Sequence, residues 1–181
     1  MPLSDYVLLD RDGVINADSD AFIKSPEEWR PLPGSLEAIA ELSRHGIKVV
    51  VISNQSGLAR GLFDLATLQR IHDKMRRMVE AHGGEISAIY FCPHGPDDGC
   101  SCRKPKPGLL QAFGRDYQVE LRGIPLIGDS LRDIQAARAV GAAPILVKTG
   151  KGRQTLADNP DIDIPVFEDL HDAVPYLLAK Q

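Results

Sequence analysis

The sequence predicts an α/β fold of three layers, in which a mainly parallel sheet is covered by helices on both faces. Three observations lead to this class. Short apolar runs alternate with amphipathic stretches almost from end to end of the chain. The runs have polar flanks and several are rich in β-branched side chains, which is typical of strands buried on both faces. The length of 181 residues suits one such unit, so we expect residues 1–181 to form a single domain.

The first half of the chain is expected to begin with a strand–helix–strand unit. Tyr6–Leu9 is a short buried-strand pattern, and residues 47–52 form a stronger one because β-branched side chains dominate that run. Between the two strands we expect a helix that Ser35 caps and Gly46 ends. Asp64 then opens a second helix, whose apolar residues recur at helical spacing until a pair of glycines closes it.

The second half continues the alternation of strands and helices. The expected elements are a strand at 86–92, a helix from Gly108 to about Tyr117, a strand at 125–127, a helix at 131–140, a strand at 144–147, an edge strand at 166–167 and a closing helix over 170–178. Residues 150–165 show no clear pattern, and we expect a solvated loop there. Sheets of this kind place ligand sites at the carboxyl ends of their strands, so the polar motifs are sought at those ends.

Composition and charge exclude several classes of function. The 21 basic residues are outnumbered by 25 acidic ones, so no broad positive field favours nucleic acid or an anionic membrane. No apolar run approaches the length of a spanning helix, and the N-terminal segment lacks the charged and apolar regions of a signal peptide. We therefore expect a cytoplasmic protein that binds neither nucleic acid nor membrane.

Polar residues of unusual type follow four of the expected strands. They are the segments Asp10-Arg11-Asp12-Gly13, Ser53-Asn54-Gln55-Ser56-Gly57, Arg103-Lys104-Pro105 and Gly128-Asp129 with Asp133. Two carboxylates one residue apart, with a third from a neighbouring strand, form an oxygen-rich site that suits magnesium. A hydroxyl, backbone amides and a lysine suit phosphoryl oxygens. Each signal alone is more typical of a turn, but their order and placement together indicate phosphoryl transfer.

The three cysteines of the chain fall within eleven residues and form a second cluster. Cys92-Pro93-His94 is followed, after five residues, by Cys100-Ser101-Cys102. A set of three thiols and one imidazole suits tetrahedral zinc, and because four protein ligands close the shell, the zinc is expected to be structural. The alternative is a group of exposed, inert thiols. We expect residues 92–102 to form a zinc-binding loop that delivers Arg103 and Lys104 to the phosphate.

Four of these segments, DRDG, SNQSG, RKPKPG and GDSLRD, resemble the motifs of the haloacid dehalogenase (HAD) superfamily of phosphotransferases, whose fold is Rossmann-like. The resemblance implies that Asp10 is the nucleophile that forms an aspartyl-phosphate and that Asp12 is the general acid and base. It also implies magnesium ligands on the Asp10 and Asp129 side chains and on the Asp12 backbone carbonyl. Ser53 and Lys104 would bind the transferring phosphoryl group, with Asp133 in support.

The zinc loop directly before RKPKPG, together with DRDGVIN, SNQSGLARG and GDSLRDIQAA, is similar to the D,D-heptose 1,7-bisphosphate phosphatases. This narrower resemblance implies removal of the 7-phosphate from D-glycero-D-manno-heptose 1,7-bisphosphate, a step in making nucleotide-activated heptose for lipopolysaccharide core or surface glycans. It also implies a set of further residues that bind substrate. They are Arg11, Asp18, Asn54, Gln55, Ser56, Arg103 and Ser130.

The spacing of the motifs leaves no room for a large cap domain. Only about forty residues separate Asp12 from Ser53 and about fifty separate Ser53 from Arg103, and each gap is filled by one helix and one strand. We therefore expect an open site covered by a flap at residues 16–29 and by the zinc loop. Within the flap, Phe22 and Trp29 are candidates for a lid, although a lone tryptophan is more often packed in the core.

Two other functions stay open on the sequence. A histidinol-phosphate phosphatase would use the same chemistry on a different small substrate. A zinc-stabilised binding module that has lost catalysis is disfavoured, because Asp10, Asp12, Lys104 and Asp129 are all present. The expected partner is a small phosphosugar, and we expect a monomer.

Overall fold

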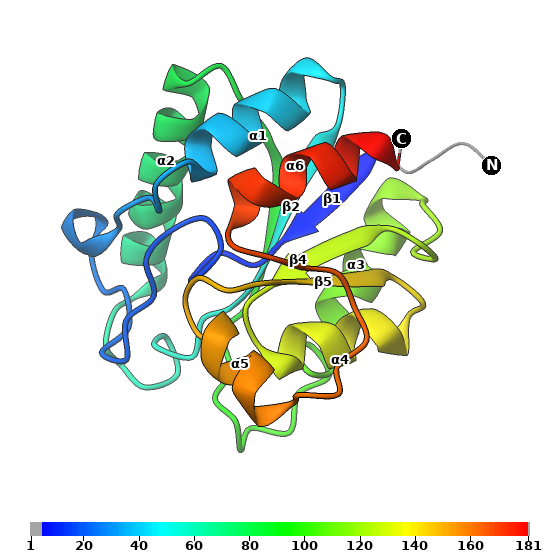
Figure 1. Ribbon diagram of the computed structural model, residues 1–181. Coiled ribbons are helices and arrows are strands. Elements are labelled where there is room, and N and C mark those ends of the chain that lie inside the picture. The colour runs from blue at the N-terminus through cyan, green and yellow to red at the C-terminus, as the bar shows by residue number, and fades with distance from the viewer. Residues whose placement is uncertain (1–4, 181) are drawn as a thin grey trace.

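The computed structural model describes residues 5–180, which contain a six-stranded parallel sheet in the order β3-β2-β1-β4-β5-β6 (Figure 1). The strands are β1 (Tyr6–Leu9), β2 (Lys48–Asn54), β3 (Ile86–Cys92), β4 (Pro125–Gly128), β5 (Ala143–Val147) and β6 (Val166–Phe167). The helices are α1 (Ser35–Arg44), α2 (Leu65–Ala81), α3 (Gly108–Tyr117), α4 (Leu131–Ala139), α5 (Gly152–Asp158) and α6 (Leu170–Ala179), with a short 3-10 helix at Pro26–Glu28. The predicted α/β class is confirmed.

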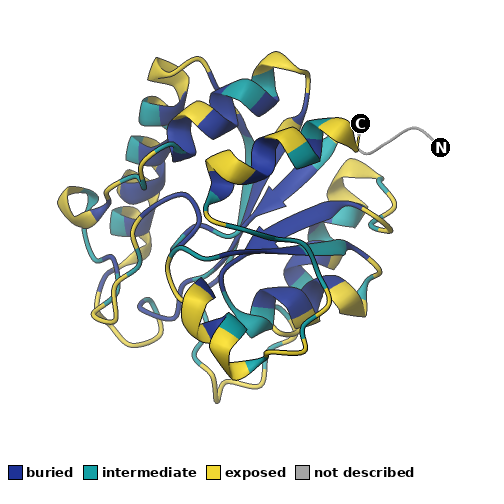
Figure 2. Ribbon diagram, in the orientation of Figure 1, coloured by how far each residue is buried: buried dark blue, intermediate teal, exposed yellow. Residues whose placement is uncertain are grey.

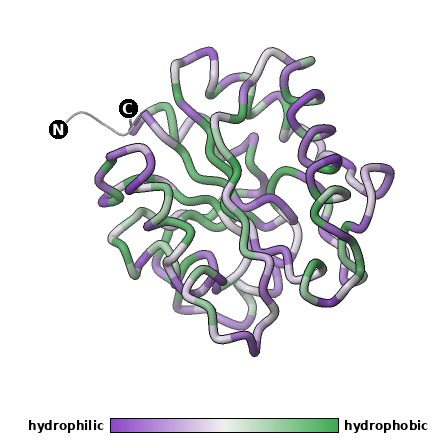
Figure 3. Tube along the Cα trace, turned by 180° about the vertical axis from the view of Figure 1, so that it is seen from behind, coloured by the Kyte–Doolittle hydropathy of each residue, from purple (hydrophilic) through white to green (hydrophobic). Residues whose placement is uncertain are grey.

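The sheet lies between two layers of helices because successive side chains of a strand point to opposite faces. Val7 and Leu9 of β1 belong to a core cluster shared with α1, α2 and α6, whereas Leu8 belongs to a second cluster shared with α3 and α4. Figure 2 shows the central strands buried and the outward faces of the helices exposed. Seen from behind, the hydrophobic segments of the trace run through its centre (Figure 3).

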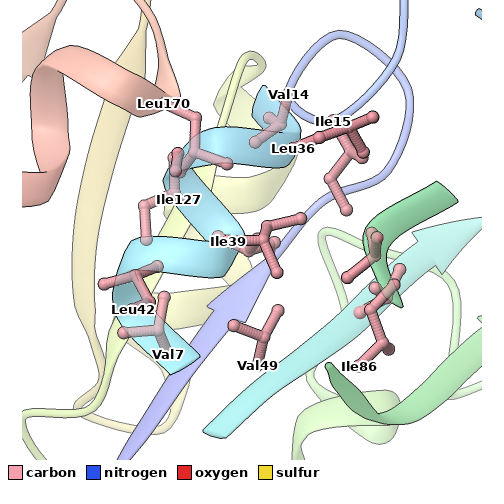
Figure 4. Close-up of a cluster of buried hydrophobic side chains, with 14 of the residues drawn as sticks. Val7, Val14, Ile15, Leu36, Ile39, Leu42, Val49, Ile86, Ile127 and Leu170 are labelled. Atoms are coloured by element: carbon pink, nitrogen blue, oxygen red, sulfur yellow. The ribbon is translucent and has the colours of Figure 1, made fainter. Parts of the chain in front are cut away.

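Helix α1 packs its apolar side on the sheet, between the segment that follows β1 and strand β2. Leu36, Ile39 and Leu42 recur at helical spacing and are 4%, 0% and 0% exposed. In the close-up of Figure 4, Leu42 lies beside Val7 of β1 and Leu36 lies at the other end of the helix, and residues from β2, β4 and α6 belong to the same cluster. This packing anchors the flap, because Ile23 and Trp29 of the flap are buried in the same cluster.

The strand order creates a switch point at the carboxyl end of β1. From β1 the chain moves to β2 and β3 on one side, and then crosses back to β4 and β5 on the other side. A crevice therefore opens where the chain leaves β1 and β4, the place at which open α/β sheets bind ligands. Asp10 follows β1 and Asp129 follows β4, so this topology brings the two carboxylates to one point.

Two local predictions differ from the structure. Ser35 is not the cap of α1: the cap is Gly34, whose φ of 79° is left-handed, and the Ser35 hydroxyl donates instead to the carbonyl of Ile15 at 2.7 Å. Residues 150–165 are not only loop, because α5 occupies 152–158. That helix is short, and Thr155 anchors it by donating to the backbone carbonyl of Asp129 at 2.8 Å.

The described residues form no separate unit over the site. Between β1 and β2 they contain the flap with its short 3-10 helix and then α1, and between β2 and β3 they contain α2. None of the helices at residues 5–180 has both the length and the apolar character needed to cross a membrane. The expectation of a single domain over 1–181 stays a prediction.

The packing of α1 gives a stability prediction. Leu42→Ala should lower the free energy of unfolding by about 3 kcal/mol, because the side chain is fully buried and its removal leaves a cavity. Leu65→Ala, the same change at a side chain that is 50% exposed, should cost less than about 0.5 kcal/mol. Urea denaturation of both variants measures the difference. Equal losses would show that α1 is not anchored by this contact.

Candidate active site

A buried ammonium group lies among the polar side chains that follow the strands. Lys104, in the loop after β3, is 3% exposed and donates to the backbone carbonyl of Ile52 at 2.7 Å. Its Nζ also lies 3.1 Å from Asp10 Oδ1 and 2.6 Å from Asp133 Oδ1. Burial opposes the charged form, but the two carboxylates outweigh it and raise the pKa of Lys104. The lysine is therefore a cation that ties β1, β2 and α4 together.

Carboxylates outnumber this cation. Asp10, Asp129 and Asp133 each offer an oxygen within 4.8 Å of the others. Burial and the charge of Asp133 raise the pKa of Asp10 well above its ordinary value and raise the pKa of Asp129 to about 6. Both shifts reflect burial first and then the negative charge that these hard oxygen donors share. That donor set fits magnesium, as the sequence predicts for Asp10 and Asp129.

Two glycines allow the backbone to approach Asp129 closely. Gly13 and Gly150 have φ of 84° and 57°, and a Cβ at either position would collide with the Asp129 carboxylate. The backbone N–H of Lys151 donates to the same carboxylate at 2.9 Å. The loops after β1 and β5 are thereby held against Asp129, and only residues without a side chain fit at these two points.

Asp12 lies in an environment opposite to that of Asp10. Its Oδ1 accepts from Arg11 Nε and Asn16 Nδ2, both at 2.9 Å, and its Oδ2 accepts from Gln55 Nε2 at 3.2 Å. Burial raises its pKa, but the Arg11 charge and these hydrogen bonds outweigh burial and lower the pKa below the ordinary value. Asp12 is therefore ionised at neutral pH in the ligand-free protein.

The end of β2 contacts both the loop that carries Lys104 and the carboxylate of Asp12. The side-chain amide of Asn54 donates to the Lys104 carbonyl at 3.1 Å and accepts from the Lys104 N–H at 3.0 Å, which fixes the loop that carries the lysine. The Ser53 hydroxyl accepts from Gln55 Nε2 at 2.7 Å and is buried. Gln55 thus joins Ser53 to Asp12. These three side chains hold the predicted phosphate-binding segment in one conformation.

A cavity of about 320 Å³ lies over these groups. The residues predicted from sequence that line it are Asp12, Asp18, Asn54, Gln55, Ser56, Arg103, Asp129 and Ser130. Ser130 also donates to Asp133 Oδ2 at 2.9 Å, which caps α4. In the flap, Phe22 lines the cavity, whereas Trp29 is fully buried and packs in the core. Of the two lid candidates, only Phe22 is placed to contact a ligand.

The Arg11 side chain does not line the cavity, whereas other basic residues do, among them two arginines that the sequence analysis did not name. The Arg11 guanidinium is fully buried and does not line the cavity, because it turns back to Asp12 and His72. Arg60 and Arg132 do line the cavity, as does Lys151. The two arginines lie inside the motifs SNQSGLARG and GDSLRD, so the signal was present in the segments already singled out.

Three guanidinium groups gather in one part of the cavity. Burial lowers the pKa of Arg103, and the charges of Arg132 and Arg60 lower it further. Arg60 is held in place by its Nε, which donates to Ser56 Oγ at 3.4 Å, and by the Phe22 ring, whose centroid lies 5.3 Å from the guanidinium carbon. Cations that repel one another in this way favour an anionic ligand.

The loop after β3 brings together the four predicted zinc ligands. The Sγ atoms of Cys92, Cys100 and Cys102 and the Nδ1 of His94 all lie within 4.8 Å of one another. Cys92 Sγ is 3.7 Å from Cys100 Sγ and 3.0 Å from Cys102 Sγ. Ligands at about 2.3 Å from a tetrahedral zinc would be about 3.8 Å apart, so the cluster fits the ion after small side-chain shifts. The Arg103 guanidinium donates to the His94 carbonyl at 3.5 Å and links the cluster to the cavity.

Known families match most of the chain. A family described as "Polynucleotide kinase 3 phosphatase" matches residues 8–134, and one described as "HAD-hydrolase-like" matches residues 101–173. The D-glycero-beta-D-manno-heptose-1,7-bisphosphate 7-phosphatase of Bordetella bronchiseptica is 62% identical over 151 residues, which cover 83% of this chain and 84% of that protein. The enzyme of the same name from Pseudomonas aeruginosa is 55% identical over 164 residues, which cover 91% of this chain and 92% of that protein.

Solved structures of D,D-heptose 1,7-bisphosphate phosphatases also match this chain. The crystal structure of D,D-heptose 1,7-bisphosphate phosphatase from B. bronchiseptica, complexed with magnesium and phosphate, matches with a TM-score of 0.94 and 56% identity, covering 97% of this chain and 99% of that chain. The D,D-heptose 1,7-bisphosphate phosphatase from Burkholderia thailandensis matches with a TM-score of 0.76 and 43% identity, covering 96% of this chain and 98% of that chain.

The cysteine cluster gives a prediction about metal content. Purified protein should contain about one zinc per chain, and Cys102→Ser should lose most of it because one of the four ligands is removed. The variant should also lose phosphatase activity, since the loop carries Arg103 and Lys104. Elemental analysis measures the zinc, and Ser101→Ala, at the exposed residue between two ligands, is the control. Zinc-free wild-type protein would contradict the prediction.

Proposed function

Because the chain belongs to the family of D-glycero-β-D-manno-heptose-1,7-bisphosphate 7-phosphatases within the HAD-like hydrolases, we propose that it hydrolyses the 7-phosphate of the heptose bisphosphate and leaves the 1-phosphate. The product, heptose 1-phosphate, is the precursor of ADP- or GDP-heptose for lipopolysaccharide core or surface glycans. The observation that carries the proposal is a cluster of guanidinium groups in the cavity that is also lined by Asp12 and Asp129, next to the buried carboxylate of Asp10.

The first step of the proposed reaction is attack by Asp10 on phosphorus. A carboxylate oxygen of Asp10 forms a bond to the 7-phosphorus while the bond to the sugar oxygen breaks, and the leaving oxygen takes a proton from the Asp12 carboxyl. Asp12 is ionised in the free protein, so it must gain that proton when the substrate binds. The negative charge of the incoming phosphate favours this gain. Lys104 would offset charge on the transferring group, with Ser53 as a further contact.

The second step regenerates the nucleophile. Asp12, now a carboxylate, takes a proton from water, whose oxygen attacks phosphorus and breaks the bond to Asp10, releasing phosphate. Asp10, Asp129 and the backbone carbonyl of Asp12 would hold magnesium, with Asp133 in support. Magnesium, when bound, supplies positive charge that offsets the charge of the phosphoryl oxygens. The contact with Lys104 suits Asp10 to the role of nucleophile, and the hydrogen bonds to Asp12 suit that residue to the role of acid and base.

The guanidinium cluster favours the bisphosphate over histidinol phosphate. Arg60, Arg103 and Arg132 would attract a second phosphate, but they would repel the ammonium group that histidinol carries. Intact acidic and basic groups around Asp10 disfavour a binding module without catalysis. We propose that the enzyme is a monomer that acts on its phosphosugar substrate in the cytoplasm.

The proposed role of Asp10 as nucleophile predicts that replacing one of its carboxylate oxygens by nitrogen reduces activity. Asp10→Asn should reduce turnover of the heptose bisphosphate by at least about a thousandfold, because the amide is not a nucleophile, while the fold persists. Asp161→Asn, at an exposed position in the loop before β6, should leave turnover unchanged. Phosphate release measures activity, and circular dichroism measures folding. Near wild-type turnover by a folded Asp10→Asn variant would exclude the covalent mechanism.

The cluster of arginines predicts a defect specific to bisphosphates. Arg132→Met should raise KM for the heptose bisphosphate about tenfold with little change in kcat, because a charge-assisted contact to the second phosphate is lost. KM for heptose 7-phosphate, which lacks that phosphate, should change much less. Steady-state kinetics with both substrates and with Arg122→Met as an exposed control make the comparison. Equal losses on the two substrates would remove Arg132 from second-phosphate recognition.

A further inference from the structure

The guanidinium of Arg11 is a fully buried cation that the proposed reaction does not use directly. It lies on the side of Asp12 away from the cavity, with Nε 2.9 Å and Nη2 2.8 Å from Asp12 Oδ1. A buried guanidinium is costly unless its donors have partners. Its presence one residue from Asp10 therefore indicates a role in the arrangement of Asp12.

His72 of α2 lies on the other side of this guanidinium. Its Nε2 is 3.1 Å from Arg11 Nη1, and the imidazole is 7% exposed. An arginine has no acceptor, so Nε2 must accept the hydrogen bond and the ring proton must be on Nδ1. Burial and the Arg11 charge lower the pKa of His72 to about 3, which agrees with a neutral ring. His72 thus accepts from Arg11 without neutralising its charge.

The hydrogen bonds distinguish the two oxygens of the Asp12 carboxylate. Oδ1 accepts hydrogen bonds from Arg11 Nε and Asn16 Nδ2, and Arg11 Nη2 lies 2.8 Å from it in an ion pair without hydrogen-bond geometry. Oδ2 accepts from Gln55 alone among the described residues, and the Asp12 side chain is 24% exposed. A proton on Asp12 would reside on Oδ2, because protonation of Oδ1 would cost hydrogen bonds to charged donors. Oδ2 is the oxygen available to the reacting groups.

We propose that His72 and Arg11 are positioning residues that orient Asp12. His72 fixes the plane of the Arg11 guanidinium, and the guanidinium holds Asp12 Oδ1. The other oxygen, Oδ2, is then the one that serves as the acid and base. This inference rests on the proposed role of Asp12. Neither side chain lines the cavity. A carboxylate at position 72 would weaken the hold of Arg11 on Asp12, and an apolar side chain would leave Nη1 without its acceptor, so a neutral acceptor is required there.

A pair of neutral polar variants tests the role of His72. The side-chain oxygen of Gln reaches the position of Nε2, whereas that of Asn is one bond shorter and reaches only the position of Nδ1. His72→Asn should lower kcat for the heptose bisphosphate by about tenfold, a fraction of what general acid–base catalysis supplies, with KM changed less than about twofold. His72→Gln should recover most of kcat. Steady-state phosphate release measures both constants.

An aryl phosphate separates orientation of Asp12 from general damage to the site. The phenolate of para-nitrophenyl phosphate leaves without a proton, so its first turnover needs Asp10 and the bound metal but not the acid. In rapid mixing, His72→Asn should release the first equivalent of para-nitrophenolate within about twofold of the wild-type rate, and only later turnovers should be slow. Circular dichroism and zinc content verify that each variant is folded.

Each outcome supports or overturns the inference. Wild-type kcat in folded His72→Asn would overturn it, as would equal losses in the Asn and Gln variants. A slow first turnover on the aryl phosphate would assign the defect to Asp10 or the metal and not to Asp12. The proposed function fails by a different result, namely that wild-type protein with magnesium releases no phosphate from the heptose bisphosphate. That result would remove the basis of the inference as well.

Discussion

The site depends on the buried ion network around Lys104. Its ammonium group contacts Asp10 after β1, the Ile52 carbonyl of β2 and Asp133 of α4, while the Lys104 backbone pairs with Asn54. A buried charge is stable only when it is paired and hydrogen-bonded, so the loop after β3 must lie where these partners meet. The nearby thiol–imidazole cluster fixes the same loop from its other end. The loop is thus constrained on both sides of Arg103.

Two aspartates separated by one residue acquire different properties from their surroundings. Asp10 lies among carboxylates, which together with burial raise its pKa, whereas Asp12 is clamped by Arg11, Asn16 and Gln55, which lower its pKa. The first environment favours a bound cation, and the second holds a carboxylate in one orientation. The difference arises from the partners that each side chain meets, since Asp10 pairs with Lys104 and Asp12 with Arg11. The Asp10 side chain lies at the switch point of the sheet, and the Asp12 side chain meets Asn16 and Gln55.

Local sequence was enough to predict the parts of the molecule that depend on neighbouring residues along the chain. The strands at Tyr6–Leu9 and Ile86–Cys92 were predicted with the bounds that the structure has, because a run of apolar residues with polar flanks reflects burial on both faces. Two predictions were wrong, namely that Ser35 caps α1 and that the segment containing α5 is only a loop. A serine at the start of a helix fits equally well as a cap or as a donor to a distant carbonyl. Arg60 and Arg132 were missed because a cation that lines a cavity has no local signature that separates it from a solvated one.

The sequence by itself determined the fold class, the order of the motifs and the residue types available at each strand end. It also determined the set of three cysteines and one histidine that the loop brings together. Only the tertiary structure decided the direction of each polar side chain. Arg11 turns away from the cavity because His72, sixty-one residues later in the chain, provides a buried acceptor behind it. That contact joins a strand end to a distant helix, and nothing in the spacing of either segment along the chain specifies it.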